Sequence, residues 1–191
     1  MKSRVQVRKK DILSGKKIGI GVTGSIAAYK SAEVVSYLHK HEAHVTVLMT
    51  KSAAKFITPL TFQTLSHNRV ITDLFDDNYY FDPQHIALSE QLDLLLVAPA
   101  SANIIGKIVS GIADDILSTV ITSLDISKVI IAPVMNEKMY LNPIVQKNIT
   151  TLKEIGYHFI EPEEGSLVCG FGIGRFPSLD KIIKEVENHI S

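Results

Sequence analysis

Short apolar runs alternate with amphipathic segments along most of the chain. Four runs, at 17–22, 44–49, 92–98 and 128–132, have the length of β-strands, and nearly every position of 92–98 is apolar. A strand that is apolar on both faces is typical of a parallel sheet covered by helices on both sides. The pattern therefore predicts an α/β fold, namely a Rossmann-like (flavodoxin-like) parallel sheet with helices on both faces, in three layers.

The segments between these runs have the spacing of helices. Pro59, Gly156 and Ser178 are expected to mark a helix start, a helix end and an N-cap. Helices or helical turns are expected at 25–40, 52–57, 59–66, 100–110, 114–123, 142–155 and 178–190, and further strands at 70–74 and 157–160. The segment 76–84 is polar, aromatic and proline-bearing, which predicts a surface loop.

Composition adds limits to this picture. The chain has 191 residues, 46% hydrophobic and 21% charged, which is typical of one globular domain, expected at 16–191 after a basic, flexible arm at 1–15. The formal net charge of zero argues against binding to nucleic acid or to an anionic membrane. The sequence has neither a secretory signal nor an apolar run of about 18 residues, the length of a membrane span. With a single cysteine no intramolecular disulfide can form, so a cytoplasmic location is expected.

Two candidate binding segments follow the strands predicted at 17–22 and 92–98, at the sheet edge where α/β folds bind ligands. The small residues from Gly21 to Ser25 precede a helix, which suits a phosphate, although a tight turn without a ligand has the same composition. The segment 99–103 (PASAN) leaves room for a flat ligand and offers Ser101 and Asn103 as hydrogen-bonding groups. An N-cap followed by a turn is the alternative interpretation of these two residues.

Two later segments carry further candidate chemistry. Residues 133–143 combine two methionines, a tyrosine and Asn136, which suits an apolar pocket with an amide donor for a carboxylate, with core packing as the alternative. Residues 165–175 contain four glycines and Cys169, which predicts a mobile or strained loop able to close over a site. His85 is a candidate general base, with a surface histidine as the alternative. One cysteine and scattered histidines do not have metal-ligand spacing, so no metal site is expected.

Taken together, these segments resemble a known family. GSIAAYK, PASAN, PVMNEKMYLNP and VCGFGIGR stand in the order and spacing of the homo-oligomeric flavin-containing cysteine decarboxylases, over about residues 16–185. The resemblance implies FMN as cofactor and a homotrimer or dodecamer with FMN at the subunit boundary. It also implies a separate phosphopantothenate–cysteine ligase as pathway neighbour, because bacterial relatives often carry the ligase fused to this domain.

The resemblance also implies roles for individual residues. His85 would be the active-site base, Cys169 the acid, and Asn136 the holder of the substrate carboxylate. The flavin would be bound by Gly24, Ser25, Ile26, Thr50, Lys51, Ser52, Ser101, Ala102, Asn103, Ile104 and Val134. The substrate would be flanked by Met139 and covered by Ser166, Leu167 and Val168. The chain departs from the family where Ile104 replaces a common Thr, Asp115 a common Asn and Tyr140 a common Trp, and the Ile104 change puts one flavin contact in doubt.

The implied reaction is the decarboxylation of 4′-phosphopantothenoylcysteine to 4′-phosphopantetheine in coenzyme A biosynthesis. A saturated cysteine carboxylate has no electron sink, and a flavin provides one by accepting a hydride. Oxidation to a thioaldehyde would precede the loss of carbon dioxide, and the resulting enethiol would then be reduced. Three alternatives stay open: a peptidyl-cysteine decarboxylase that stops at the enethiol, a flavin prenyltransferase relative, and a non-catalytic regulatory flavoprotein. His85 and the MNxxM segment fit the prenyltransferase poorly, and Cys169 argues against stopping at the enethiol.

Overall fold

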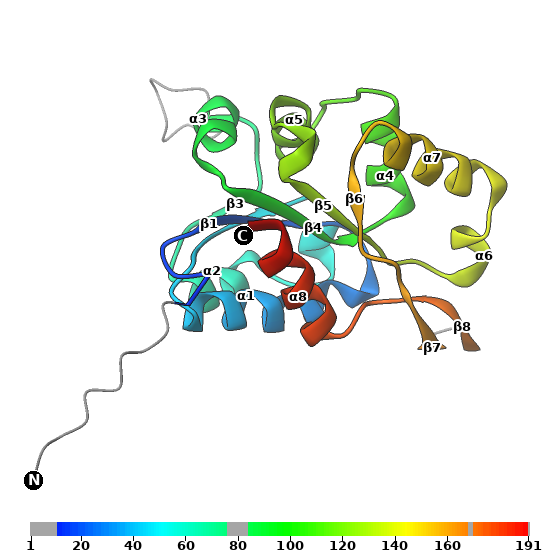
Figure 1. Cartoon of the computed structure of the whole chain (residues 1–191), viewed down its shortest axis with the longest axis horizontal. Coiled ribbons are helices and arrows are strands. Elements are labelled where there is room, and N and C mark those ends of the chain that lie inside the picture. Colours follow the sequence, from blue (N-terminus) through cyan, green and yellow to red (C-terminus); the bar gives the residue numbers. More distant parts are fainter. Residues whose placement is uncertain (1–10, 76–83, 168–169, 191) are drawn as a thin grey trace, which may run out of the picture.

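The computed structural model describes residues 11–75, 84–167 and 170–190 (Figure 1). Six strands form one parallel sheet in the order β3-β2-β1-β4-β5-β6. They are β1 (Lys17–Val22), β2 (His44–Met49), β3 (Val70–Ile71), β4 (Leu94–Ala100), β5 (Val129–Pro133) and β6 (His158–Phe159). The predicted parallel sheet is confirmed, with β3 shorter than the run 70–74. The strand order changes direction between β1 and β4, and this is where such sheets bind ligands.

Helices cover both faces of the sheet (Figure 1). One apolar cluster packs against the face covered by α1 (Ser31–Lys40), α2 (Pro59–Ser66) and α8 (Leu179–Ile190). A second cluster lies on the opposite face, under α3 (Gln84–Gln91), α4 (Ala102–Val109), α5 (Ile116–Ser123) and α7 (Pro143–Glu154). Short helical turns complete the fold: η1 (Ile26–Lys30), η2 (Ala53–Lys55), η3 (Ile126–Lys128) and α6 (Glu137–Tyr140). In the described part of the chain, no helix is both long and apolar enough to cross a membrane.

The helix predicted at 25–40 is divided in two. The tight turn η1 comes first and α1 begins at Ser31. The buried Ser31 hydroxyl donates a hydrogen bond of 2.6 Å to the Ala98 carbonyl. This bond ties the junction to β4 and fixes the residues of η1 close to the end of the neighbouring strand.

Most of the glycine-rich segment 165–175 forms a hairpin, so the prediction of an irregular loop is wrong for this part of the segment. Strands β7 (Glu163–Leu167) and β8 (Gly170–Arg175) pair antiparallel. Gly174 has φ +125°, and a Cβ there would lie 2.1 Å from the Met135 carbonyl oxygen. The Glu137 carboxylate also accepts a hydrogen bond of 3.2 Å from the Ile173 N–H. Glycine therefore lets the hairpin lie directly against the segment that follows β5.

The predicted boundary of the N-terminal arm is too late in the chain. Leu13 is fully buried in the core, and Asp11 contacts His41 through Oδ2 and Nδ1 at 2.5 Å. Residues 11–15 therefore pack against the domain, while residues 1–10 lie outside the described part of the chain.

Gly21 provides a test of the packing beneath the site. A Cβ at this position would lie 2.6 Å from Leu117 Cδ1, in the core. We expect Gly21→Ala to lower the free energy of unfolding by about 1–3 kcal/mol, because overpacking forces buried side chains to shift. Chemical denaturation followed by circular dichroism measures the change.

The matched control is Gly106→Ala in α4, where an added Cβ meets nothing within 4 Å. This variant should be as stable as the unmodified protein or up to about 1 kcal/mol more stable, because alanine favours a helix. Equal stability of the two variants would contradict the packing argument.

Candidate active site

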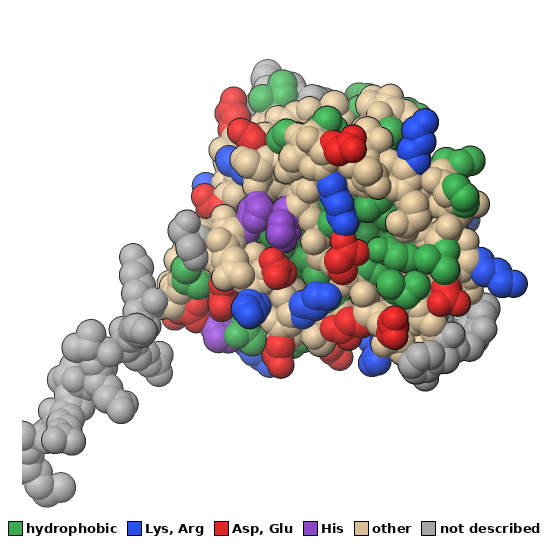
Figure 2. Space-filling model, turned by 45° about the vertical axis from the view of Figure 1, so that its right-hand side comes forward, with side chains coloured by type: hydrophobic (Ala, Val, Ile, Leu, Met, Phe, Trp, Pro, Cys, Tyr) green, Lys and Arg blue, Asp and Glu red, His purple; other side chains and the backbone are tan. Residues whose placement is uncertain are grey.

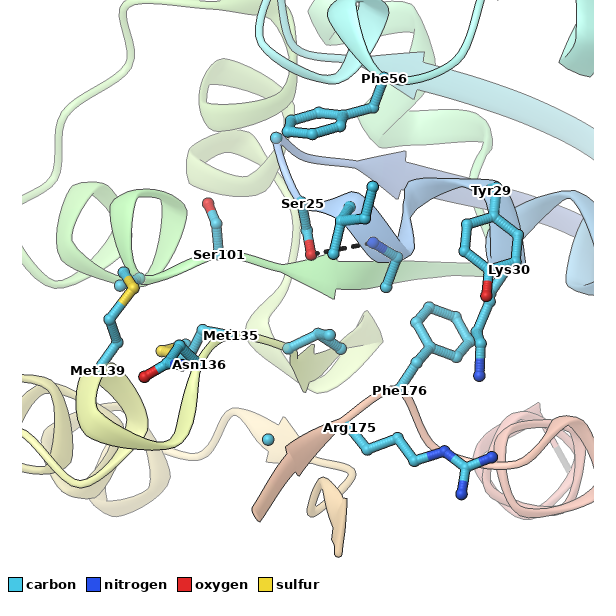
Figure 3. Close-up of a pocket in the computed structure, with 16 residues that line it drawn as sticks. Ser25, Tyr29, Lys30, Phe56, Ser101, Met135, Asn136, Met139, Arg175 and Phe176 are labelled. Carbon is cyan, nitrogen blue, oxygen red and sulfur yellow. Dashed lines mark hydrogen bonds between the residues drawn. The ribbon is translucent and has the colours of Figure 1, made fainter. Parts of the chain in front are cut away.

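A cavity of about 600 Å³ opens at the carboxyl ends of β1 and β4, where the strand order changes direction (Figure 3). Its walls come from five parts of the chain: the turn after β1 with η1, the end of η2, the start of α4, the segment after β5, and the end of β8. The lining residues are Gly24, Ser25, Ile26, Ala27, Tyr29, Lys30, Phe56, Ser101, Ala102, Val134, Met135, Asn136, Met139, Gly174, Arg175 and Phe176.

Thr23 holds two of these walls together. Its buried hydroxyl donates to the Pro99 carbonyl at 2.6 Å and accepts from the Ser101 N–H at 2.9 Å. One side chain therefore links the turn after β1 to the turn after β4. Sequence reasoning placed Thr23 inside a small-residue cluster but assigned it no role, since its partners lie more than seventy residues away.

The turn at Gly24 has the features of an anion site. A Cβ on Gly24 would lie 2.6 Å from Ser52 Cβ, so glycine is required for the two loops to approach each other. Ser25 is the N-cap of η1, and its hydroxyl accepts from the Ala27 N–H at 3.3 Å. Within the described residues, the N–H groups of Gly24 and Ile26 have no acceptor. These N–H groups are suited to a phosphate oxygen.

Asn136 supplies a polar group to an otherwise apolar wall. Val134 and Met135 are buried, whereas Met139 is half exposed. The Asn136 Oδ1 accepts the Lys138 N–H at 2.9 Å and so caps α6. Because the carbonyl oxygen is engaged, the amide NH₂ is the group left to bind a ligand. Figure 3 shows Asn136 between Met135 and Met139, on the side of the cavity that faces Ser101.

The opposite end of the cavity is cationic and aromatic. Lys30, Arg175, Phe176 and Tyr29 gather there, away from Asn136 (Figure 3). Lys30 and Arg175 stand in the motifs GSIAAYK and VCGFGIGR, but the sequence predicts no role for either residue. Nothing in the local sequence indicates that the end of η1 and the end of β8 meet.

The cavity brings together half of the residues predicted to bind the cofactor or the substrate. Predicted residues in its lining are Gly24, Ser25, Ile26, Ser101, Ala102, Val134, Asn136 and Met139. Thr50, Lys51 and Ser52 lie outside the lining, although Ser52 contacts the turn at Gly24. Asn103 is exposed outside the cavity, and Ile104 is buried in the apolar core under α4. Ile104 points into the sheet because it occupies the inward face of the first turn of α4.

Other predicted residues cannot be placed against the cavity by their side chains. Val168 and Cys169 lie outside the described residues, and Ser166 and Leu167 are described by their backbone in β7. His85 is the second residue of α3, again described by its backbone. Helix α3 packs against α5, and none of its described residues lines the cavity.

The structure accounts for two departures from the resembled family. Asp115 is the N-cap of α5 in a capping box with Ser118, and its carboxylate pairs with Lys107 at 2.6 Å. The Tyr140 hydroxyl donates to Glu161 at 2.9 Å. Burial, followed by this bond to a carboxylate, raises the pKa of Tyr140 to about 12, so the hydroxyl stays protonated.

Comparison with known proteins identifies the family. The model of the family described as Flavoprotein matches residues 6–191. The chain belongs to this flavoprotein family. A relative from Streptococcus mutans, the probable phosphopantothenoylcysteine decarboxylase, is 46% identical over 180 residues, which cover 92% of this flavoprotein and 99% of the relative.

A bifunctional relative and a solved structure extend the comparison. The coenzyme A biosynthesis bifunctional protein CoaBC of Bacillus subtilis is 44% identical over 181 residues, which cover 94% of the flavoprotein described here. The chain spans only 44% of that relative's length. A solved mutant PPC decarboxylase complexed with pantothenoylaminoethenethiol superposes with a TM-score of 0.82 at 28% identity, covering 91% of this chain and 97% of that one.

The cavity fits the flavin that the family name implies. The turn at Gly24 can accept a phosphate, and the buried wall of Val134 and Met135 offers an apolar surface to a flat ring. Phe56 and Ile26, each more than half exposed, border the same opening. A ring bound here would cover apolar surface that is otherwise open to water.

Proposed function

We propose that this flavoprotein uses FMN to decarboxylate 4′-phosphopantothenoylcysteine to 4′-phosphopantetheine in coenzyme A biosynthesis. The observation that carries the proposal is one cavity that joins a turn suited to a phosphate, an apolar wall and the amide NH₂ of Asn136. The names of the Streptococcus relative and of the solved decarboxylase support the substrate.

FMN would be the flavin, since it offers a single terminal phosphate to the turn at Gly24 and a flat ring to the apolar wall. Gly24, Ser25 and Ile26 would hold its single phosphate, with Thr50, Lys51 and Ser52 in the adjoining loop. The remaining cofactor residues would act around the ring: Ser101, Ala102 and Val134 from the lining, Asn103 from the exposed start of α4, and Ile104 as support beneath it.

The residues of the chain would bind and orient the substrate and transfer protons. When bound, the flavin supplies a hydride acceptor for the first half of the reaction and a hydride donor for the second. The Asn136 amide would donate to the substrate carboxylate, beside Met139, and aim the bond that breaks as carbon dioxide leaves. The β7–β8 hairpin, with Ser166, Leu167 and Val168, would cover the substrate and exclude water.

His85 and Cys169 would supply the proton transfers. His85 would take the thiol proton as the substrate is oxidised to the thioaldehyde, and Cys169 would protonate carbon when the enethiol is reduced. Because α3 lies against α5 and does not line the cavity, we propose that His85 reaches the site of a neighbouring copy. A homotrimer or dodecamer with FMN at the subunit boundary would provide that arrangement.

The cellular setting follows from the proposed chemistry. A phosphopantothenate–cysteine ligase would supply the substrate, and coenzyme A synthesis would place both proteins in the cytoplasm. On the face shown in Figure 2, acidic and basic side chains are interspersed around an apolar area. This face therefore offers no continuous basic patch for nucleic acid.

The test is product analysis with phosphopantothenoylcysteine. The unmodified protein should release carbon dioxide and 4′-phosphopantetheine, and heat should release FMN from it. We expect Cys169→Ser to release carbon dioxide but to accumulate the enethiol, because the acid for the reductive half is missing. Mass spectrometry separates the two products by two hydrogen atoms.

Two outcomes would count against these assignments. Normal 4′-phosphopantetheine from Cys169→Ser would remove the acid role of Cys169. If the unmodified protein forms only the enethiol, the result favours the peptidyl-cysteine type of reaction. If it turns over no cysteine carboxylate at all, the result favours a regulatory flavoprotein.

A further inference from the structure

The cationic end of the cavity combines two positive charges from distant parts of the chain. Lys30 ends η1 and Arg175 ends β8, and both line the cavity. Figure 3 shows the Lys30 ammonium and the Arg175 guanidinium on the same side of the cavity, beyond Phe176 as seen from Asn136. Two like charges placed together repel each other, so this arrangement gains free energy when an anion binds between them.

The two cations are not held in ion pairs within the described part of the protein. Lys30 and Arg175 form no ion pair with a described carboxylate. Glu163, on the strand that pairs with β8, accepts the Ser178 N–H at 2.8 Å. That bond, more than the nearby charges of Lys181 and Arg175, lowers the pKa of the Glu163 carboxyl. The Glu163 carboxylate keeps its negative charge close to Arg175 but forms no ion pair with it, so the guanidinium N–H groups have no acceptor among the described carboxylates.

Each of the two side chains lies beside a neighbouring part of the structure. The Lys30 ammonium lies 6.0 Å from the centre of the Phe176 ring, within reach of a cation–π attraction. A Cβ on Gly165 would lie 3.0 Å from Arg175 Nη1 and 3.1 Å from its Cδ, so the arginine extends closely across the neighbouring strand. Contacts that restrict a side chain reduce the entropy it loses when a ligand binds.

We propose that Lys30 and Arg175 form a subsite for a phosphomonoester dianion and that this dianion is the 4′-phosphate of the substrate. The inference rests on the proposed function, which puts the substrate carboxylate at Asn136, on the other side of the cavity. A guanidinium and an ammonium together match the double charge and the oxygens of a phosphate. The subsite would select phosphopantothenoylcysteine over cysteine carboxylates that carry no distal anion, including peptides.

The experiment measures binding to the FMN-loaded protein by calorimetry, with 4′-phosphopantetheine and pantetheine as probes. The unmodified protein should bind the phosphorylated probe at least about tenfold more tightly, which corresponds to one charge-assisted contact. Arg175→Gln and Lys30→Gln should each reduce that ratio to less than about threefold and leave pantetheine binding unchanged. Arg175→Lys should keep part of the preference. The matched control Lys147→Gln, an exposed cation on α7 outside the cavity, should keep all of it.

A second titration separates the two possible phosphates. FMN and riboflavin are titrated into flavin-free protein and followed by flavin fluorescence. Arg175→Gln should leave the affinity for both flavins unchanged. The proposal is overturned if this variant loses affinity for FMN but not for riboflavin, because the cations would then serve the cofactor. The proposal is also overturned if the unmodified protein binds neither 4′-phosphopantetheine nor pantetheine. It is overturned as well if Arg175→Gln lowers the affinity for both of these probes equally.

Different results would overturn the proposed function and the proposed phosphate subsite. A protein that prefers 4′-phosphopantetheine through Arg175 but does not decarboxylate phosphopantothenoylcysteine would overturn the proposed function and leave the phosphate subsite. A protein that decarboxylates the substrate without preferring the phosphorylated probe would overturn the subsite and leave the function.

Discussion

The Asn136→Asp variant is expected to lose at least about 100-fold in kcat/KM while keeping its fold and its flavin. An aspartate oxygen can still accept the Lys138 N–H that caps α6, so the local structure should persist. The substitution removes the one amide donor on that wall of the cavity and places a negative charge against the substrate carboxylate. The lost hydrogen bond and the added repulsion both lower kcat/KM, because both act on the carboxylate that leaves as carbon dioxide.

Asn142→Asp is the matched control for this prediction. Asn142 caps α7 through the same kind of bond, with Oδ1 accepting the Ile144 N–H at 2.9 Å, and it lies outside the cavity lining. Steady-state kinetics, with the flavin absorbance recorded for each variant, should show less than about a twofold change for this control. Equal losses in the two variants would mean that the effect comes from capping, and an active Asn136→Asp would remove the proposed carboxylate contact.

The His85→Asn variant is expected to lose at least about 1,000-fold in turnover and to remain yellow. A positioned general base contributes about 10²–10⁴ to a rate, and the proposed oxidation cannot begin while the thiol proton stays in place. Asparagine keeps a polar side chain of similar reach but cannot accept a proton at neutral pH. Single-turnover bleaching of the flavin absorbance, measured after mixing with substrate, reports on this step directly.

Mixing two inactive variants tests where His85 acts. If each site takes Asn136 from one copy and His85 from its neighbour, co-refolded His85→Asn and Asn136→Asp chains should regain about a quarter of the unmodified activity, because random pairing restores that share of sites. Mixed chains that stay inactive while assembling normally would place both residues in one copy. Activity of His85→Asn by itself would remove the base assignment.

Local sequence determined the layered sheet and the position of the ligand edge. The apolar runs at 17–22 and 92–98 define β1 and β4 because a strand buried on both faces needs apolar residues throughout. Small residues directly after these strands, Gly24 after β1 and Ser101 after β4, were sufficient to predict where the cavity opens. Such features depend on residues only a few positions apart in the sequence, so a single sequence is enough to predict them.

Only the tertiary structure decided which side chains share the cavity. Thr23 joins two turns that are far apart in sequence, and Lys30 and Arg175 line the same cavity only because β8 returns to the end of η1. The same long-range packing placed Gly174 tightly against Met135 and directed Ile104 into the core. Residue types and spacing specify elements and strand ends, whereas the contacts between distant elements depend on how the whole sheet and its helices pack.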